Sequence, residues 1–245
     1  ARPTVRPPFS GCDDFGLSAS MHPAKEVGGD FYDFFLIDQD HCGVVIADVS
    51  GKGVPAALFM MRVKALLNQL LREDLSPDQV LARANDGLCE DNEAGMFVTV
   101  WLGVLDLRSG KLVYANGGHN PPLYRHADGS VEWMRDRSGL LLGSFEGVPY
   151  RVFERTMIRG DSLILYTDGV TEAMDASDHC YGDERLFQLV ERECDGYPAS
   201  VSGVIEEDVR AFAEGADQAD DITLLVLRYD GQENGPAASA AGNRG

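Results

Sequence analysis

Short apolar runs joined by hairpin-length turns fill most of this chain, and they restrict the folds that it can adopt. Strands are predicted at 31–37 and 43–49, joined by the turn DQDH, because both runs are rich in β-branched and aromatic residues. Further strands are predicted at 96–106, 111–116, 123–126, 130–133, 152–157, 162–167 and 222–229. Strands joined by such short turns pair antiparallel, so the sheets should be largely antiparallel.

Helices are predicted in two separate pairs. One pair, 55–73 and 76–89, follows the first hairpin, and the other, 183–194 and 199–213, precedes the last strand. Pro55 suits the first turn of a helix, and Ser76 with Gln79 matches a capping box. Antiparallel sheets flanked by these helices, an α+β sandwich, are the expected layered arrangement.

Charge, hydropathy and cysteine spacing indicate which partners and which cellular location to expect. The net charge of −19 argues against a nucleic-acid partner, and no apolar stretch approaches the length of a membrane span. The five cysteines are widely spaced and form no CxxC pair, as is typical of reduced thiols in a cytoplasmic protein. We expect a linker at 1–18, one folded domain at 19–230 and a disordered tail at 231–245.

Acidic residues at the ends of apolar runs need a separate explanation. Asp30 precedes the first predicted strand and Asp48 lies near the end of its partner, so the two should be neighbours at one sheet end. Asp168 ends a later run, and Asp220 and Asp221 precede the last strand. One alternative is that these acids are turn residues, because Asp beside glycine is common in turns. A group of such acids, however, must be neutralised, and an oxygen-rich cluster selects Mg²⁺ or Mn²⁺.

Such a cluster is suited to phosphoryl chemistry, since two divalent ions can position and activate a water for attack on phosphorus. The nearby glycines Gly28, Gly29, Gly51, Gly53 and Gly169 would let the backbone approach the ions. No GxSxG elbow or GxxxxGK[ST] phosphate loop offers another mechanism.

Six segments together resemble one protein family. They are AKEVGGDFYDFF, ADVSGKGVPAALFM, MFVTVWLGVLD, ANGGHNPPLY, LILYTDGVTEA and ADDITLLVLR, in this order. They look like the bacterial stage-II-sporulation-E-type protein serine/threonine phosphatases, a branch of the metal-dependent phosphatase 2C superfamily. The resemblance covers residues 19–229 and implies a four-layer sandwich: two stacked antiparallel sheets flanked on both outer faces by pairs of helices.

The resemblance also implies a centre of two Mn²⁺ or Mg²⁺ ions. Asp48 would bridge the ions, with the backbone carbonyl of Val49 as a further ligand. Asp30 would serve one ion largely through waters, and Asp168 and Asp220 would serve the other. Asp221 would be a ligand or would act through hydrogen bonds to the ligands.

One departure concerns the leaving group. Eukaryotic members of the superfamily carry DGHGG, whose histidine is proposed as the general acid, whereas this chain has DVSGKG. His119 of GGHNPP is a candidate substitute or substrate-binding group, the alternative being a histidine that orders its loop. Lys25 could steer the substrate phosphate, the alternative being a solvated lysine.

The expected function is hydrolysis of phosphoserine or phosphothreonine on a protein by metal-bound hydroxide. The resemblance implies an anti-sigma factor antagonist as substrate and an upstream sensor or receiver domain. The apolar face of 62–73 would be core or a homodimer seam. Two alternatives remain open: a catalytically silent regulatory or binding module, and a hydrolase of small phosphate esters.

Overall fold

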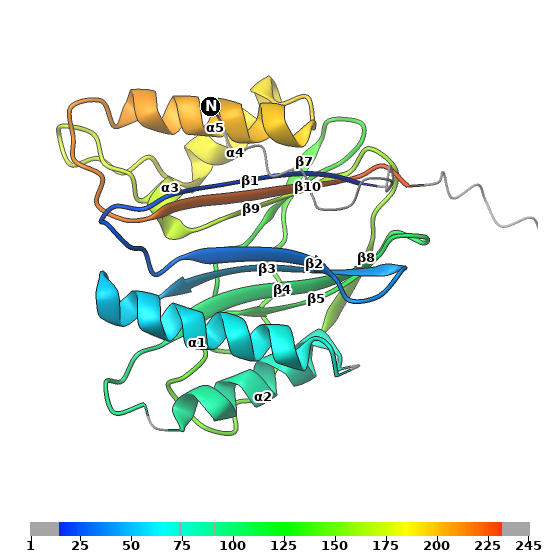
Figure 1. Ribbon diagram of the computed structural model, residues 1–245. Helices are drawn as coiled ribbons and strands as arrows, with labels where there is room; N and C mark the ends of the chain where they lie inside the picture. Colours follow the sequence, from blue (N-terminus) through cyan, green and yellow to red (C-terminus); the bar gives the residue numbers. More distant parts are fainter. Residues whose placement is uncertain (1–14, 74, 91, 232–245) are drawn as a thin grey trace, which may run out of the picture.

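Two five-stranded antiparallel sheets stacked face to face form the centre of the fold (Figure 1). The computed structural model describes residues 15–73, 75–90 and 92–231. The first sheet has the order β1 (Phe15–His22), β10 (Ile222–Tyr229), β9 (Ser162–Tyr166), β6 (Leu123–Arg125) and β7 (Val131–Trp133). The second has the order β2 (Phe31–Leu36), β3 (His41–Val49), β4 (Val98–Asp106), β5 (Lys111–Gly117) and β8 (Phe153–Thr156).

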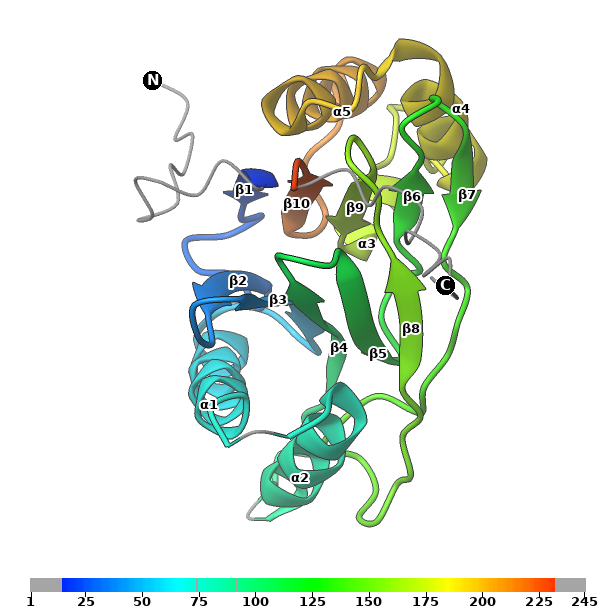
Figure 2. The same ribbon diagram turned by 90° about the vertical axis from the view of Figure 1, so that its right-hand side faces the viewer.

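Helices cover the outer face of each sheet. Helices α1 (Val54–Leu70) and α2 (Pro77–Cys89) lie on the sheet that contains β3, and α4 (Asp183–Glu193) and α5 (Pro198–Phe212) lie on the other (Figures 1 and 2). The short helix α3 (Asp168–Thr171) follows β9 directly. This arrangement confirms the predicted four-layer α+β sandwich.

Alternating side chains of the strands build three apolar layers. Val45, Ala47 and Val49 of β3 pack against α1 and α2, whereas Val44 and Ile46 face the space between the sheets. This alternation follows from the two-residue period of a β-strand. A third layer lies between the β9–β10 sheet and helices α4 and α5. The sheets are therefore held together by an apolar interior over most of their area.

The apolar face of 62–73 belongs to the core, because Val63, Leu67, Leu70 and Leu71 are all buried. The capping box at the start of α2 is confirmed, with the Ser76 amide donating to Oε1 of Gln79 at 3.2 Å.

Strand β1 and the short helix α3 were not predicted from the sequence. Strand β1 pairs with β10 along its whole length, from Phe15 opposite Tyr229 to His22 opposite Ile222. Residues 15–18, which were assigned to a linker, therefore belong to the sheet. Across the described ranges, no helix combines the length and the apolar character that crossing a membrane requires.

Candidate metal centre

The pairing of β2 with β3 brings the first two acids together. Phe31 lies opposite Ala47, so Asp30, one residue earlier, faces Asp48, one residue later. The two carboxyl groups are within hydrogen-bonding range of each other. Only 2% of Asp30 is exposed, and Asp48 is partly buried. The structure thus places them side by side at one end of the sheet, as the sequence predicted.

Two threonines of the opposite sheet fix the Asp30 carboxylate. The hydroxyls of Thr167 and Thr223 each donate to Oδ2 of Asp30 at 2.7 Å. Thr167 follows β9 and Thr223 lies in β10, so these hydrogen bonds connect the ends of the two sheets. Neither threonine was predicted as a site residue, although each lies within three residues of a candidate acid, in TDG and DDIT.

The remaining acids approach from the same opposite sheet. Asp168 begins α3 directly after β9, and Asp220 precedes β10. Nζ of Lys52, in the loop after β3, is 2.8 Å from Oδ2 of Asp220 and donates to the carbonyl of Ala219 at 2.5 Å. Lys52 was not predicted as a site residue, because its partners are distant in sequence.

Three of the carboxyl groups, those of Asp30, Asp48 and Asp168, are costly to ionise where they lie. Burial raises the pKa of Asp30 to about 7, against the lowering effect of the two threonine hydroxyls. Burial, followed by the charges of Asp30 and Asp168, raises the pKa of Asp48 to about 9. The pKa of Asp168 is also raised, first by burial and then by the charge of Glu172. Such a cluster favours either protons or cations.

Asp221 holds the loop that carries Asp30. Its Oδ1 accepts a hydrogen bond from the Ala24 amide at 2.8 Å, and its Oδ2 accepts one from the Gly29 amide at 2.8 Å. The Asp30 amide lies 3.5 Å from the same Oδ2. Both carboxylate oxygens of Asp221 therefore contact backbone amides between residues 24 and 30. Asp221 thus has the contacts of a residue that orients the candidate ligands.

Close backbone approach explains the glycines around the acids. A Cβ on Gly28 would lie 2.3 Å from Oδ2 of Asp221, and one on Gly29 would lie 2.9 Å from the Val49 carbonyl oxygen. The carbonyl of Val49, the candidate backbone ligand, therefore lies against the loop that carries Asp30.

His119 is buried within its own loop. Its Nδ1 is 2.8 Å from Oγ1 of Thr99, and its amide donates to Oδ1 of Asn116 at 2.8 Å. Its Nε2 is buried and makes no hydrogen bond within the described residues. Burial lowers the pKa of His119 to about 4, so the imidazole is neutral at physiological pH. These contacts favour the loop-ordering role.

Lys25 lies at the start of the loop that carries Asp30. It is exposed, beside Ala24, whose amide is bound by Asp221. Its exposure is compatible with either of the roles expected for it.

The donor set fits a divalent ion that prefers oxygen ligands. Within the described ranges, no three acidic, histidine or cysteine side chains already surround one point as a finished ion site. Asp30, Asp48, Asp168, Asp220 and the Val49 carbonyl nevertheless offer only oxygen atoms, the ligands that Mg²⁺ and Mn²⁺ prefer. Burial is the first cause of the raised pKa values of Asp30, Asp48 and Asp168, and bound cations would stabilise the charged form of these carboxyl groups.

Known proteins are similar to this chain in sequence and in fold. RsbU of Bacillus subtilis strain 168, named a phosphoserine phosphatase, is 30% identical over 86% of this chain and 62% of its own length. The chain thus spans less than two thirds of this relative. The SiaA-PP2C domain of Pseudomonas aeruginosa has a similar structure, with a TM-score of 0.78 at 21% identity over 87% of this chain and 86% of that one.

A third likeness is to a structure described with metal ions. The catalytic domain of the serine/threonine protein phosphatase PstP, described in complex with two manganese ions, has a TM-score of 0.61 at 16% identity. It covers 88% of this chain and 98% of its own. Because identity is this low, the likeness shows a common fold.

The family follows from the sequence match. The profile of the Stage II sporulation protein E family matches residues 38–230, which include every candidate ligand except Asp30. The six segments quoted above occur in the expected order, and the fold is that of PP2C phosphatases. This chain therefore belongs to the Stage II sporulation protein E (SpoIIE) family.

Proposed function

We propose that this chain is a metal-dependent protein phosphatase that hydrolyses phosphoserine or phosphothreonine on a regulatory protein. The observation that carries the proposal is the convergence of Asp30 and Asp48 from one sheet with Asp168 and Asp220 from the other. The name of the relative RsbU, a phosphoserine phosphatase, supports the reaction type. The manganese ions of PstP support the choice of cofactor.

Four carboxylates and one carbonyl would hold the ions. Asp30, Asp48, Asp168 and Asp220, with the Val49 carbonyl, would bind two Mn²⁺ or Mg²⁺ ions. When bound, such ions make water a stronger nucleophile and offset negative charge on a phosphoryl group.

The surrounding residues would keep the acids in place. The hydroxyls of Thr167 and Thr223 both hold Oδ2 of Asp30. Asp221 orders the loop of Asp30 through the backbone. Lys52 orients Asp220 and places one positive charge at the rim, where it would attract a phosphate group. Lys25, which is exposed on the loop that carries Asp30, would steer the substrate phosphate.

The protein substrate proposed here is an anti-sigma factor antagonist, and the regulator is an upstream sensor or receiver domain. Membership of the SpoIIE family supports both proposals. RsbU is longer than the region matched here, which leaves room in that relative for a regulatory part.

The first experiment measures hydrolysis of p-nitrophenyl phosphate and of a phosphoserine peptide with and without Mn²⁺. Asp48→Ala should abolish Mn²⁺-dependent turnover of both. Glu191→Ala, which removes an exposed acid on α4, is the matched control and should retain activity.

Other outcomes would overturn the proposal. Absence of turnover together with absence of Mn²⁺ binding in calorimetry would contradict the metal centre. Mn²⁺ binding without turnover on any substrate would favour a silent regulatory module. Faster hydrolysis of free nucleotides than of phosphopeptides would favour a hydrolase of small phosphate esters.

A further inference from the structure

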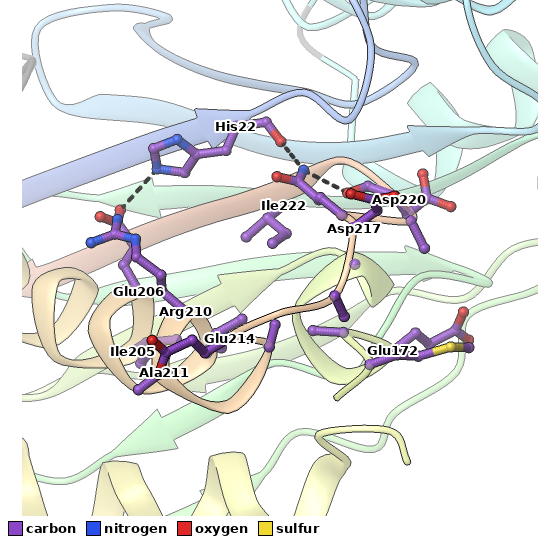
Figure 3. A pocket seen from close by; sticks show the side chains of 18 of the residues that line it. His22, Glu172, Ile205, Glu206, Arg210, Ala211, Glu214, Asp217, Asp220 and Ile222 are labelled. Carbon is purple, nitrogen blue, oxygen red and sulfur yellow. Dashed lines mark hydrogen bonds and ion pairs between the residues drawn. The ribbon is translucent and has the colours of Figure 1, made fainter. Parts of the chain in front are cut away.

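A cavity of about 720 Å³ opens directly beside the candidate metal centre. Lys52, Gly169 and Asp220 line the end of the cavity that adjoins the acids. From there it extends between α5 and the segment that follows α3. Figure 3 shows Glu214, just beyond the end of α5, and Glu172, beyond α3, on separate sides of this space. Its volume is that of pockets that bind small molecules or several side chains.

The lining combines an apolar floor with an acidic rim. Ile205 and Val209 of α5, with Ile222 and Leu224 of β10, supply the apolar part. The lining contains one lysine and one arginine, Lys52 and Arg210, and a larger number of acidic side chains. The acidic residues are Glu172, Glu206, Glu207, Glu214, Asp217 and Asp220. Asp220 is paired with Lys52, and Glu206 lies 3.8 Å from His22. Glu214 and Asp217 are exposed, so their negative charges are available to a bound molecule.

The loop at the rim is already ordered. Nε2 of Gln218 donates to the carbonyls of His22 and Asp220, each at 2.7 Å. Lys52 binds the carbonyl of Ala219 in the same loop. These hydrogen bonds hold the rim loop in place, so little ordering of this loop would oppose binding.

We infer that this cavity binds the substrate segment next to the phosphorylated residue, and that it selects segments carrying lysine or arginine. The inference rests on the proposed phosphatase function. A phosphoserine held at the acids would leave its neighbouring residues beside Lys52 and Asp220, where the cavity begins.

The chemistry of the lining defines that segment. The aliphatic part of a lysine or arginine side chain covers apolar surface while its charged end reaches acids, as the floor and rim require. An acidic segment would be repelled by Glu214 and Asp217, and by the net charge of −19 of the whole chain. The cavity would therefore distinguish between phosphoproteins that the metal centre alone would treat alike.

The test compares phosphoserine peptides that differ in one flanking residue, which is lysine, alanine or glutamate in turn at each position. The double variant Glu214→Lys/Asp217→Lys changes the rim. Glu191→Lys/Glu193→Lys makes the same change of charge on exposed positions of α4 and serves as the control. Each kcat/KM is expressed relative to hydrolysis of p-nitrophenyl phosphate by the same protein.

At one or more positions, the unmodified protein should prefer lysine over glutamate by roughly fivefold, as expected for a few exposed charge pairs. The preference should decrease with added salt. It should vanish or reverse in the rim variant and persist in the α4 variant.

Three results would overturn the inference: no preference in the unmodified protein, a preference that survives in the rim variant, or self-association that only the rim variant loses. The last would assign the cavity to a second copy of the chain.

If no phosphopeptide is hydrolysed, the proposed function fails, but the cavity is still tested by fluorescence anisotropy with the unphosphorylated peptides. Tighter binding of the lysine peptides, lost only in the rim variant, would support the inference, and equal binding would refute it.

Discussion

The neighbouring carboxyl groups of Asp30 and Asp48 are costly to ionise because they are buried close together. Their pKa values are raised to about 7 and about 9, so the folded protein retains protons that the unfolded chain releases above pH 4. Under this linkage, stability decreases as pH rises wherever the folded state binds more protons. The ion-free protein should therefore lose stability as pH rises from about 4 to about 9.

The substitution Asp48→Asn tests this relation. It removes one of the two acids but keeps the shape of the side chain. At pH 8 without metal, the variant should be more stable than the unmodified protein by about 1–3 kcal/mol. The gain should shrink as pH falls toward 4 and vanish below it, where the unfolded chain also becomes protonated at both acids. Urea unfolding in the presence of a chelator, at several pH values, measures the difference.

A turn acid provides the control. Asp128 accepts hydrogen bonds from the amide and hydroxyl of Ser130, which lower its pKa. Asp128→Asn should therefore leave stability unchanged or slightly reduced at pH 8. Lower stability of Asp48→Asn than of the unmodified protein at pH 8 would contradict the argument.

At the scale of elements, a close backbone contact restricts which residue can occupy position 169, where β9 leads into α3. A Cβ on Gly169 would lie 2.0 Å from the carbonyl oxygen of Asp221, just before β10. Main-chain atoms cannot move aside as a flexible side chain can. Glycine at this position therefore allows Asp168 and Asp220 to approach the same place.

Gly169→Ala should thus destabilise the protein by about 3 kcal/mol and weaken Mn²⁺ binding. Gly87→Ala is the matched control in α2, where the nearest atom to the new Cβ would be Cδ2 of Leu66 at 3.4 Å. That change should be neutral or should stabilise the protein by up to about 1 kcal/mol, because alanine favours a helix. Thermal unfolding and calorimetry give the two readouts. Equal stability of the two variants would refute the proposed role of Gly169.

Local patterns predicted the elements whose partners are near in sequence. The β2–β3 hairpin could be predicted because a turn joins two apolar runs, and the neighbouring positions of Asp30 and Asp48 followed from it. Strand β1 could not, because its partner β10 is at the other end of the chain and Ser18 and Ser20 interrupt its apolar pattern. The roles of Thr167, Thr223 and Lys52 also depend on contacts between distant segments.

At the scale of the whole molecule, the two sheets are joined by apolar contacts in the middle and by polar contacts at one end. Between them lies an apolar layer that includes Trp101, Tyr114 and Tyr229. At the end that carries the acids, polar contacts replace it, from Thr167 and Thr223 to Asp30 and from Lys52 to Asp220. Bound ions would therefore connect both sheets at once.

Hydrogen exchange followed by mass spectrometry tests this connection. Mn²⁺ should slow exchange at 28–32 and 47–52 in one sheet and at 166–170 and 220–223 in the other, because ligands from both become fixed together. The turn at 37–41, at the opposite end of β2 and β3, should exchange at an unchanged rate. Asp48→Asn should remove the protection from both sheets. Protection confined to one sheet would mean that the ions bind only half of the acids, and the centre formed by four carboxylates would be wrong.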